Sequence, residues 1–170
     1  RLHSVRGHAS AGGVSDLSFL SNPASSLLTC GADNVAKLWD LRASSSQAQR
    51  TMRPSATGVV TGSEPLLSVS ADCEGRLCAC AVSMQVHMFD LASGKELFTH
   101  AEAHSQPISR LRFHPRRAHE LVTAGDDGLI CALDVRRCGG QTEEDDAGLR
   151  IVVNNEEEGV RLLTFLGEGA

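Results

Sequence analysis

Three segments of the chain repeat one pattern of apolar residues, and this repetition constrains the fold more than any other feature. The pattern apolar-x-x-Leu-x-Phe begins at Val14, at Ile108 and at Val160. The offsets are 94 and 52 residues, so the longer interval has room for one further, degraded copy. Repetition at such intervals is typical of architectures that stack similar structural units.

A second pattern follows the first two copies at a similar distance along the chain. A short apolar segment ends in a turn that contains an aspartate, and another apolar segment comes next. Asp33 stands six residues before Trp39, and Asp127 stands six residues before Leu133. Short apolar segments separated by turn residues indicate β-strands joined by hairpins.

A middle copy lies between these two. Segments 77–82 and 86–90 flank a turn, Phe89 takes the position of Trp39, and segment 95–99 supplies a fourth strand. The steps from Trp39 to Phe89, and from there to the matching leucine of the last copy, are 50 and 44 residues. With one enlarged loop, they agree with the period of about 40–45 residues that four-stranded propeller blades show.

We therefore predict an all-β chain that forms part of a β-propeller. It would hold about three four-stranded antiparallel blades plus flanking strands of neighbouring blades. Because propellers close at typically 4–8 blades, we expect the complete protein to be longer at both ends. The predicted blade-like units are approximately 7–52, 65–99 and 104–155, with a strand of a preceding blade at 2–6 and the start of the next blade at 159–170.

The first copy resembles the WD-repeat family. Gly7-His8, Asp33 and Trp39-Asp40 match the signature of that family. The resemblance implies a protein–protein interaction scaffold without catalytic chemistry of its own. Since one fold can carry many functions, the inference is by analogy with the fold.

The resemblance also implies a structural hydrogen-bonded set made of His8, Thr29, Asp33 and Trp39. An ionised Asp only accepts hydrogen bonds and an indole N–H only donates, whereas neutral His and a Thr hydroxyl do both. Such a set can satisfy all of its polar groups while it is buried. The third copy would repeat the set without the indole through His104, Thr123 and Asp127.

The other copies depart from the family signature. Ala103 replaces the glycine before His104 in the third copy, where Leu133 replaces the tryptophan. The second copy has Ser83 and Phe89 at the positions of the aspartate and the tryptophan.

A hydrolase is the alternative from another functional class, because His8, Thr29 and Asp33 have the residue types of a catalytic triad. If it were correct, these side chains would be accessible in a pocket rather than packed between strands. The set recurs with the spacing of the blades, and the chain has no Gly-x-Ser-x-Gly elbow. We therefore predict that the chain is not an enzyme and has no small-molecule substrate.

Metal binding is a further alternative, since Cys73, Cys78 and Cys80 lie close together and His100 precedes His104 by four residues. A structural zinc site needs four ligands, and each of these half-sites lacks its partner half. Cys78 and Cys80 share one face of a strand, so burial is the simpler interpretation. We predict no metal and no cofactor.

The segment Trp39-Asp40-Leu41-Arg42 also resembles the Trp-Asp-x-Arg box, through which some WD-repeat proteins dock on the adaptor of cullin-4 ubiquitin ligases. Arg42 could bind a carboxylate of that adaptor in a bidentate manner. The alternative is that Asp40 and Arg42 simply complete an exposed turn. A partial second copy of the box contains Asp134 and Arg136.

Composition narrows the choice of partners to other proteins. The net charge is −5, with acidic clusters at 143–146 and 156–158, which argues against a nucleic-acid surface. The longest apolar runs are far shorter than the roughly 20 residues needed to cross a bilayer. Most of the six cysteines lie in apolar stretches, which favours a reducing intracellular compartment, the cytoplasm or the nucleus.

Overall fold

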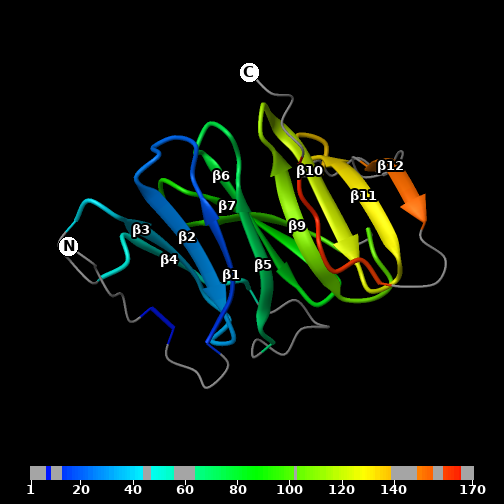
Figure 1. The fold of residues 1–170 in the computed structure, drawn as a ribbon, viewed down its shortest axis with the longest axis horizontal. Coiled ribbons are helices and arrows are strands. Elements are labelled where there is room, and N and C mark those ends of the chain that lie inside the picture. Colours follow the sequence, from blue (N-terminus) through cyan, green and yellow to red (C-terminus); the bar gives the residue numbers. More distant parts are fainter. Residues whose placement is uncertain are drawn as a thin grey trace.

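The protein folds entirely from β-strands within the part that the structure describes. The computed structural model describes residues 7–8, 13–43, 47–55, 64–101, 103–138, 149–154 and 159–165. Twelve strands in these residues form three four-stranded antiparallel sheets (Figure 1). The predictions of an all-β chain and of three four-stranded blades are therefore confirmed. No helix among the described residues is long and apolar enough to cross a membrane.

Each sheet is built from four strands in chain order. The first sheet contains β1 (Val14–Phe19), β2 (Ser26–Gly31), β3 (Ala36–Asp40) and β4 (Arg50–Met52). The second contains β5 (Leu66–Ala71), β6 (Leu77–Val82), β7 (Gln85–Asp90) and β8 (Glu96–His100). The third contains β9 (Ile108–His114), β10 (Arg117–Gly125), β11 (Leu129–Asp134) and β12 (Leu149–Asn154).

The first strands of the three sheets, β1, β5 and β9, lie side by side (Figure 1). The sheets therefore stack face to face around one common edge, as the blades of a propeller do. Each sheet has two ends, and we call the end that carries the turn after its first strand and the turn after its third strand the hairpin end.

An apolar core fills the space between the first and second sheets. Leu28 and Leu38 belong to the same buried cluster as Leu66, Val69 and Phe89. Burying each leucine side chain contributes about 1.5–3 kcal/mol. This contact between sheets, rather than strand propensity, therefore holds the two blades together.

A second core lies between the second and third sheets, where Val86 and Met88 join a buried cluster with Ile108, Leu111 and Leu133. The middle sheet is thus covered on both faces. This explains why its strands β6 and β7 have nearly continuous apolar sequences instead of an alternating pattern.

The outer face of the first sheet is different, because the large apolar side chains of Val14, Leu17 and Phe19 on β1 are exposed. No sheet covers this face among the described residues.

The degraded copy of the first pattern is β5, which occupies in the second sheet the place of β1 and β9. Residues 159–165 form no strand among the described residues, so the predicted start of a next blade at 159–170 remains a prediction. This segment lies beside β9 and β10 (Figure 1), where Val160 N–H donates to Gly125 O over 3.1 Å. It meets no further described strand with which to form a continuous ladder.

The limits of the predicted units remain predictions. The strand expected at 2–6, the end of the last expected strand at 166–170 and both acidic clusters lie outside the described residues.

Candidate functional site

The structure brings His8, Thr29, Asp33 and Trp39 together at the end of the first sheet opposite the hairpin end. His8 Nδ1 lies 2.8 Å from Asp33 Oδ1, and His8 Nε2 lies 2.8 Å from Thr29 Oγ1. Trp39 Nε1–H donates to the same hydroxyl oxygen over 2.9 Å. One arrangement of protons satisfies every group: Nδ1–H donates to the carboxylate, and the threonine hydroxyl donates to Nε2.

The third sheet contains the second set. His104 Nδ1 lies 3.0 Å from Asp127 Oδ1, and Nε2 lies 2.8 Å from Thr123 Oγ1. The backbone N–H of Ser105 adds a bond of 2.9 Å to the other carboxylate oxygen. Leu133 stands in place of the indole, so this threonine oxygen receives one donor fewer.

Both aspartates are held ionised by these contacts. Burial alone raises the pKa of Asp33, but the hydrogen bond from His8 and the nearby charge of Lys37 lower it by more, so the net pKa lies below its usual range. The pKa of Asp127 is lowered in the same way, against burial, by His104 and by backbone N–H groups.

The first set ties the segment before β1 to β2, β3 and the turn between them. Its histidine side chain is 1% exposed, and the adjacent cavity, lined by His8, Thr29 and Trp39, has a volume of about 140 Å³. Pockets that bind small molecules measure about 300–1,000 Å³. With the threonine hydroxyl bonded to both the imidazole and the indole, the geometry is that of a closed structural link rather than of an exposed nucleophile.

The second sheet has a different buried histidine, which the sequence did not indicate. His87 Nδ1 lies 2.6 Å from Glu96 Oε1, and Thr99 Oγ1 donates to the same carboxylate oxygen over 3.0 Å. The other oxygen of Glu96 accepts the N–H of Ser55 over 2.8 Å. This cluster links β7 and β8 to the segment that follows β4. The missed signal was the His-Glu pair at positions 87 and 96, whose spacing has no equivalent in the other copies.

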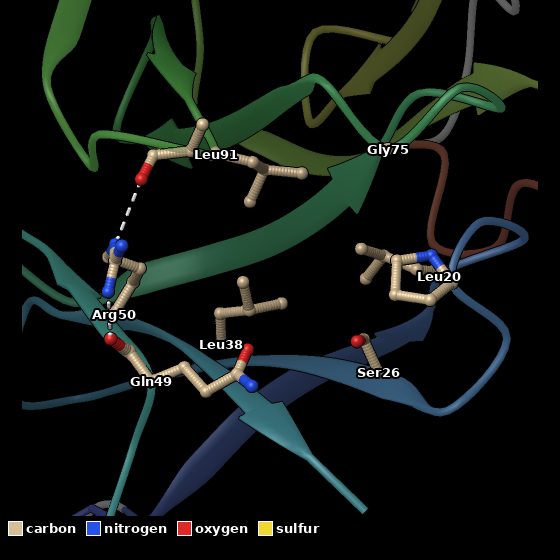
Figure 2. A pocket seen from close by; sticks show the side chains of 9 residues that line it. Leu20, Ser26, Leu38, Gln49, Arg50, Gly75 and Leu91 are labelled. Atoms are coloured by element: carbon tan, nitrogen blue, oxygen red, sulfur yellow. Dashed lines mark hydrogen bonds between the residues drawn. The ribbon is translucent and has the colours of Figure 1, made fainter.

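A groove opens at the hairpin end between the first two sheets (Figure 2). Its volume is about 420 Å³, and the side chains of Leu20, Leu38 and Leu91 line its apolar part. Arg50 lies at one side of the groove. Next to it, Leu38 of β3 faces Leu91 of the β7–β8 turn (Figure 2). The groove is thus formed by turns and strand ends from both blades.

Gly75 shapes the far side of this groove. It has φ +71°, and a Cβ atom there would lie 1.8 Å from the carbonyl oxygen of Asn22. Only glycine fits, because the β5–β6 turn of one blade approaches the backbone of the β1–β2 turn of the other.

The predicted docking pairs lie at the hairpin end as well, each on its own sheet. Arg42 donates to Asp40 Oδ1 through its backbone N–H over 2.9 Å and through Nε over 3.3 Å, and its side chain is 73% exposed. Arg136 binds both carboxylate oxygens of Asp134, over 2.9 and 2.6 Å, and these bonds lower the pKa of Asp134 to about 2. The structure does not bring the two pairs together.

The corresponding turn of the second sheet has no arginine and is one residue wider, because Gly94 N–H donates to Asp90 O, whereas Ala43 N–H donates to Asp40 O in the first sheet. Asp90 Oδ1 accepts the backbone N–H of Ser93 over 2.7 Å. An aspartate thus ends the third strand of every sheet and caps the turn after it, which accounts for Asp40 and Asp134 in structural terms.

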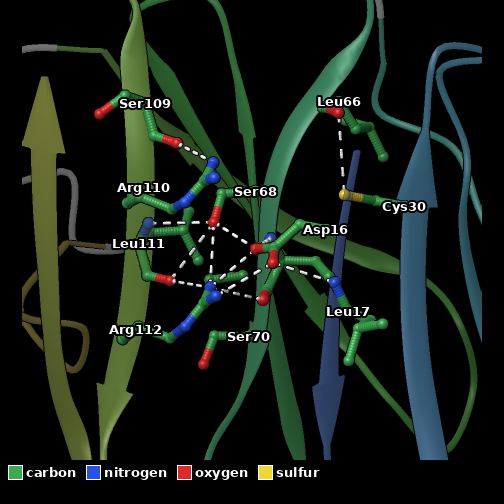
Figure 3. Close-up of polar contacts among 12 residues, drawn as sticks. Asp16, Leu17, Cys30, Leu66, Ser68, Ser70, Ser109, Arg110, Leu111 and Arg112 are labelled. Atoms are coloured by element: carbon green, nitrogen blue, oxygen red, sulfur yellow. Dashed lines mark hydrogen bonds and ion pairs between the residues drawn. The ribbon is translucent and has the colours of Figure 1, made fainter. Parts of the chain in front are cut away.

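A cluster of hydrogen-bonded polar side chains joins all three sheets at their first strands (Figure 3). Arg112 on β9 binds Asp16 on β1 in a bidentate manner, with Nη1 2.7 Å from Oδ2 and Nη2 3.0 Å from Oδ1. Ser68 on β5 lies between them and donates its hydroxyl to Asp16 Oδ2 over 2.6 Å. Its oxygen also accepts Arg112 Nη1–H over 3.1 Å.

Backbone groups complete this three-sheet link, which we define as Asp16, Ser68 and Arg112. Val69 N–H donates to Asp16 over 3.1 Å, and Leu111 O accepts from Arg112 over 2.8 Å. Burial raises the pKa of Asp16, but the bonds from Arg112, Ser68 and Val69 lower it by more, and the net pKa lies below the usual range. These hydrogen bonds therefore offset the free-energy cost of removing the Asp16–Arg112 pair from water.

The cysteines and histidines considered for metal binding do not form a site among the described residues, where no group of three or more ligating side chains is arranged around a common point. Cys78 and Cys80 are buried with their sulfur atoms 3.7 Å apart. The hydrogen bond between Cys78 and Cys80, together with burial, raises the pKa of Cys80. His104 is committed to Asp127.

The comparisons agree with the fold. The family model described as WD domain, G-beta repeat, matches residues 1–40 and 94–132. These two segments are thus similar to WD repeats, and the three sheets have the arrangement of a propeller-type fold.

In sequence the chain is similar to WD repeat-containing protein 89. It is 28% identical over 166 residues to the WD repeat-containing protein 89 homolog of Dictyostelium discoideum, covering 98% of this chain and 40% of that protein. It is also 28% identical over 169 residues to WD repeat-containing protein GTS1 of Arabidopsis thaliana, covering 96% of this chain and 39% of that protein. The chain thus spans about two fifths of the length of these relatives.

Solved structures show the same fold. The WD40 repeats of RRP9 superpose with a TM-score of 0.71 at 14% identity, covering 91% of this chain and 42% of that one. The structure of U3-55K gives a TM-score of 0.70 at 15% identity with the same coverage.

Proposed function

We propose that the protein is a non-catalytic scaffold that binds other proteins through the turns at the ends of its blades. WD-repeat propellers generally mediate protein–protein interactions, which supports this role. The observation that carries the proposal is the three-sheet link, which fixes the three blades relative to one another. Turn residues such as Arg42 and Arg136 remain exposed on this platform, and rigid scaffolds commonly present their binding residues on such turns.

The test is affinity capture of the full-length protein from cells, followed by size-exclusion chromatography and quantification of the co-purifying proteins. We expect a defined set of proteins that migrates with the scaffold in near-stoichiometric amounts. Recovery of the protein alone, at both low and physiological salt, would contradict the proposal.

A second, more specific function is recruitment of substrates to a cullin-4 type ubiquitin ligase through Asp40 and Arg42. The exposed guanidinium of Arg42, oriented by Asp40, favours it. Arg42→Ala should remove the ligase adaptor from the captured proteins, whereas the matched variant Arg116→Ala, at an exposed arginine outside both Asp-Arg pairs, should retain it. An unchanged set of partners in Arg42→Ala would mean that Asp40 and Arg42 only complete an exposed turn and do not bind the adaptor.

We also propose that the protein resides inside the cell, in the cytoplasm or the nucleus. All six cysteines are free thiols, and four of them are buried, which suits a reducing compartment. Imaging of the tagged full-length protein tests this, and secretion into the medium would contradict it.

A further inference from the structure

The groove at the hairpin end joins an apolar surface to a fixed cationic group. Leu20 and Leu91 are 4% and 3% exposed, so their side chains form a floor between the sheets rather than projecting into solvent. The volume of about 420 Å³ lies in the range of pockets that bind ligands. An apolar side chain that enters the groove would gain the free energy of leaving water.

The cationic group is the guanidinium of Arg50, which two carbonyl groups hold in place. Its Nε–H donates to Ala92 O over 3.0 Å, and Nη1–H donates to Gln49 O over 2.8 Å. A guanidinium that is oriented in advance loses less freedom when it binds an anion. Within the described part of the chain, no carboxylate lies within ion-pair distance of Arg50.

Asp40 and Asp90, which end the neighbouring strands β3 and β7, accept hydrogen bonds from residues other than Arg50. Asp40 accepts hydrogen bonds from Arg42. Asp90 accepts both the backbone N–H and the hydroxyl of Ser93, over 2.7 and 2.5 Å. The charge of Arg50 is therefore available to a carboxylate from outside these blades.

We propose that this groove binds a segment of a partner protein in which an apolar side chain stands next to an acidic one. The apolar side chain packs between the leucines of the two blades, and the carboxylate accepts hydrogen bonds from Arg50. Charge complementarity and the apolar floor select this partner chemistry over a basic segment. The inference rests on the proposed scaffold function and specifies which chemistry the scaffold recognises.

The experiment uses a phage-displayed library of 12-residue peptides, selected on the immobilised full-length protein. The affinities of enriched peptides are then measured by fluorescence polarisation. Arg50→Glu reverses the charge, and Ala92→Trp fills the groove from an exposed position. Arg116→Glu is the matched control, because it makes the same charge change at an exposed residue of the third sheet. Circular dichroism verifies that all three variants fold.

The proposal predicts enriched peptides with Leu, Ile, Met or Phe beside Asp or Glu. Their affinity should fall at least tenfold in Arg50→Glu and in Ala92→Trp, since loss of one charge-assisted hydrogen bond is sufficient for such a change. It should stay within twofold in Arg116→Glu.

Enrichment of basic peptides, peptides that bind equally to Arg50→Glu, or no enrichment at all would overturn the proposal. If affinity capture still recovers partner proteins in that case, the scaffold function stands and only the assignment of the groove fails. If capture recovers none, the scaffold function itself fails.

Discussion

Removing Arg112 should destabilise the protein more than removing an exposed charged residue would, because it leaves Asp16 without its ion-pair partner. Arg112 contributes both hydrogen bonds of the bidentate pair, and the side chains of Arg112 and Asp16 are only 25% and 10% exposed. Breaking a fully buried pair costs about 3–5 kcal/mol, and an exposed pair contributes about 0–1 kcal/mol. Asp16 keeps its bonds from Ser68 and Val69, so we expect Arg112→Leu to cost about 2–3 kcal/mol.

The assay is urea unfolding of the full-length protein followed by circular dichroism, for Arg112→Leu, Asp16→Asn and the double variant. Arg117→Leu is the control, since Arg117 pairs with Glu120 at an exposed position, and it should cost less than about 1 kcal/mol. Because Asp16 and Arg112 interact directly, the double variant should be destabilised by at least about 1 kcal/mol less than the sum of the single variants. Additive costs, or an Arg112→Leu no worse than the control, would refute the three-sheet link.

Three further predictions concern the individual blades. Thr29→Val should destabilise the protein by about 1–3 kcal/mol in urea unfolding, because a histidine nitrogen and an indole N–H lose their shared partner; Thr123→Val, which leaves no indole unpaired, should cost less. Gly75→Ala should reduce the melting temperature far more than Gly13→Ala, because both glycines have positive φ but only Gly75 would clash with backbone. The folded-state pKa of Asp33 is lowered, so the ionised carboxylate should stabilise the protein fully above about pH 4 and lose this effect as the pH falls further. The difference in stability between wild type and Asp33→Asn should therefore shrink on acidification.

Each of these has a result that contradicts it. Equal costs of the two threonine variants would mean that the indole contact adds nothing, and equal melting temperatures of the two glycine variants would mean that the turns can move apart. A gap between wild type and Asp33→Asn that grows on acidification would reverse the sign expected for a carboxylate whose folded-state pKa is lowered.

The repeat could be predicted from the sequence because strand ends carry recognisable residues. The expected strand at 77–82 coincides with β6, and the pattern that begins at Val14 coincides with β1. The hidden copy proved to be β5, where Ala71 stands at the position of the phenylalanine. The pattern that begins at Val160 forms no strand among the described residues, since a strand needs a paired neighbour as well as a pattern.

The contacts between blades could not be predicted. Asp16 and Arg112 are 96 residues apart, and they are joined through Ser68 on the one strand that the pattern missed. None of the three residues belongs to the repeated signature. The groove was equally hidden, because its lining comes from turns and strand ends of two blades, and only their spacing in the fold brings Leu20 and Leu91 together.

The most direct test of the central claim is hydrogen exchange of the full-length protein, measured with and without a captured partner protein. We predict slower exchange at the hairpin end of the first two sheets, in residues 20–26, 47–52 and 91–95, with little change around the hydrogen-bonded set of His8 at the opposite end. Unchanged exchange at the hairpin end, or protection confined to the opposite end, would contradict the account of this protein as a scaffold that binds its partners through that surface.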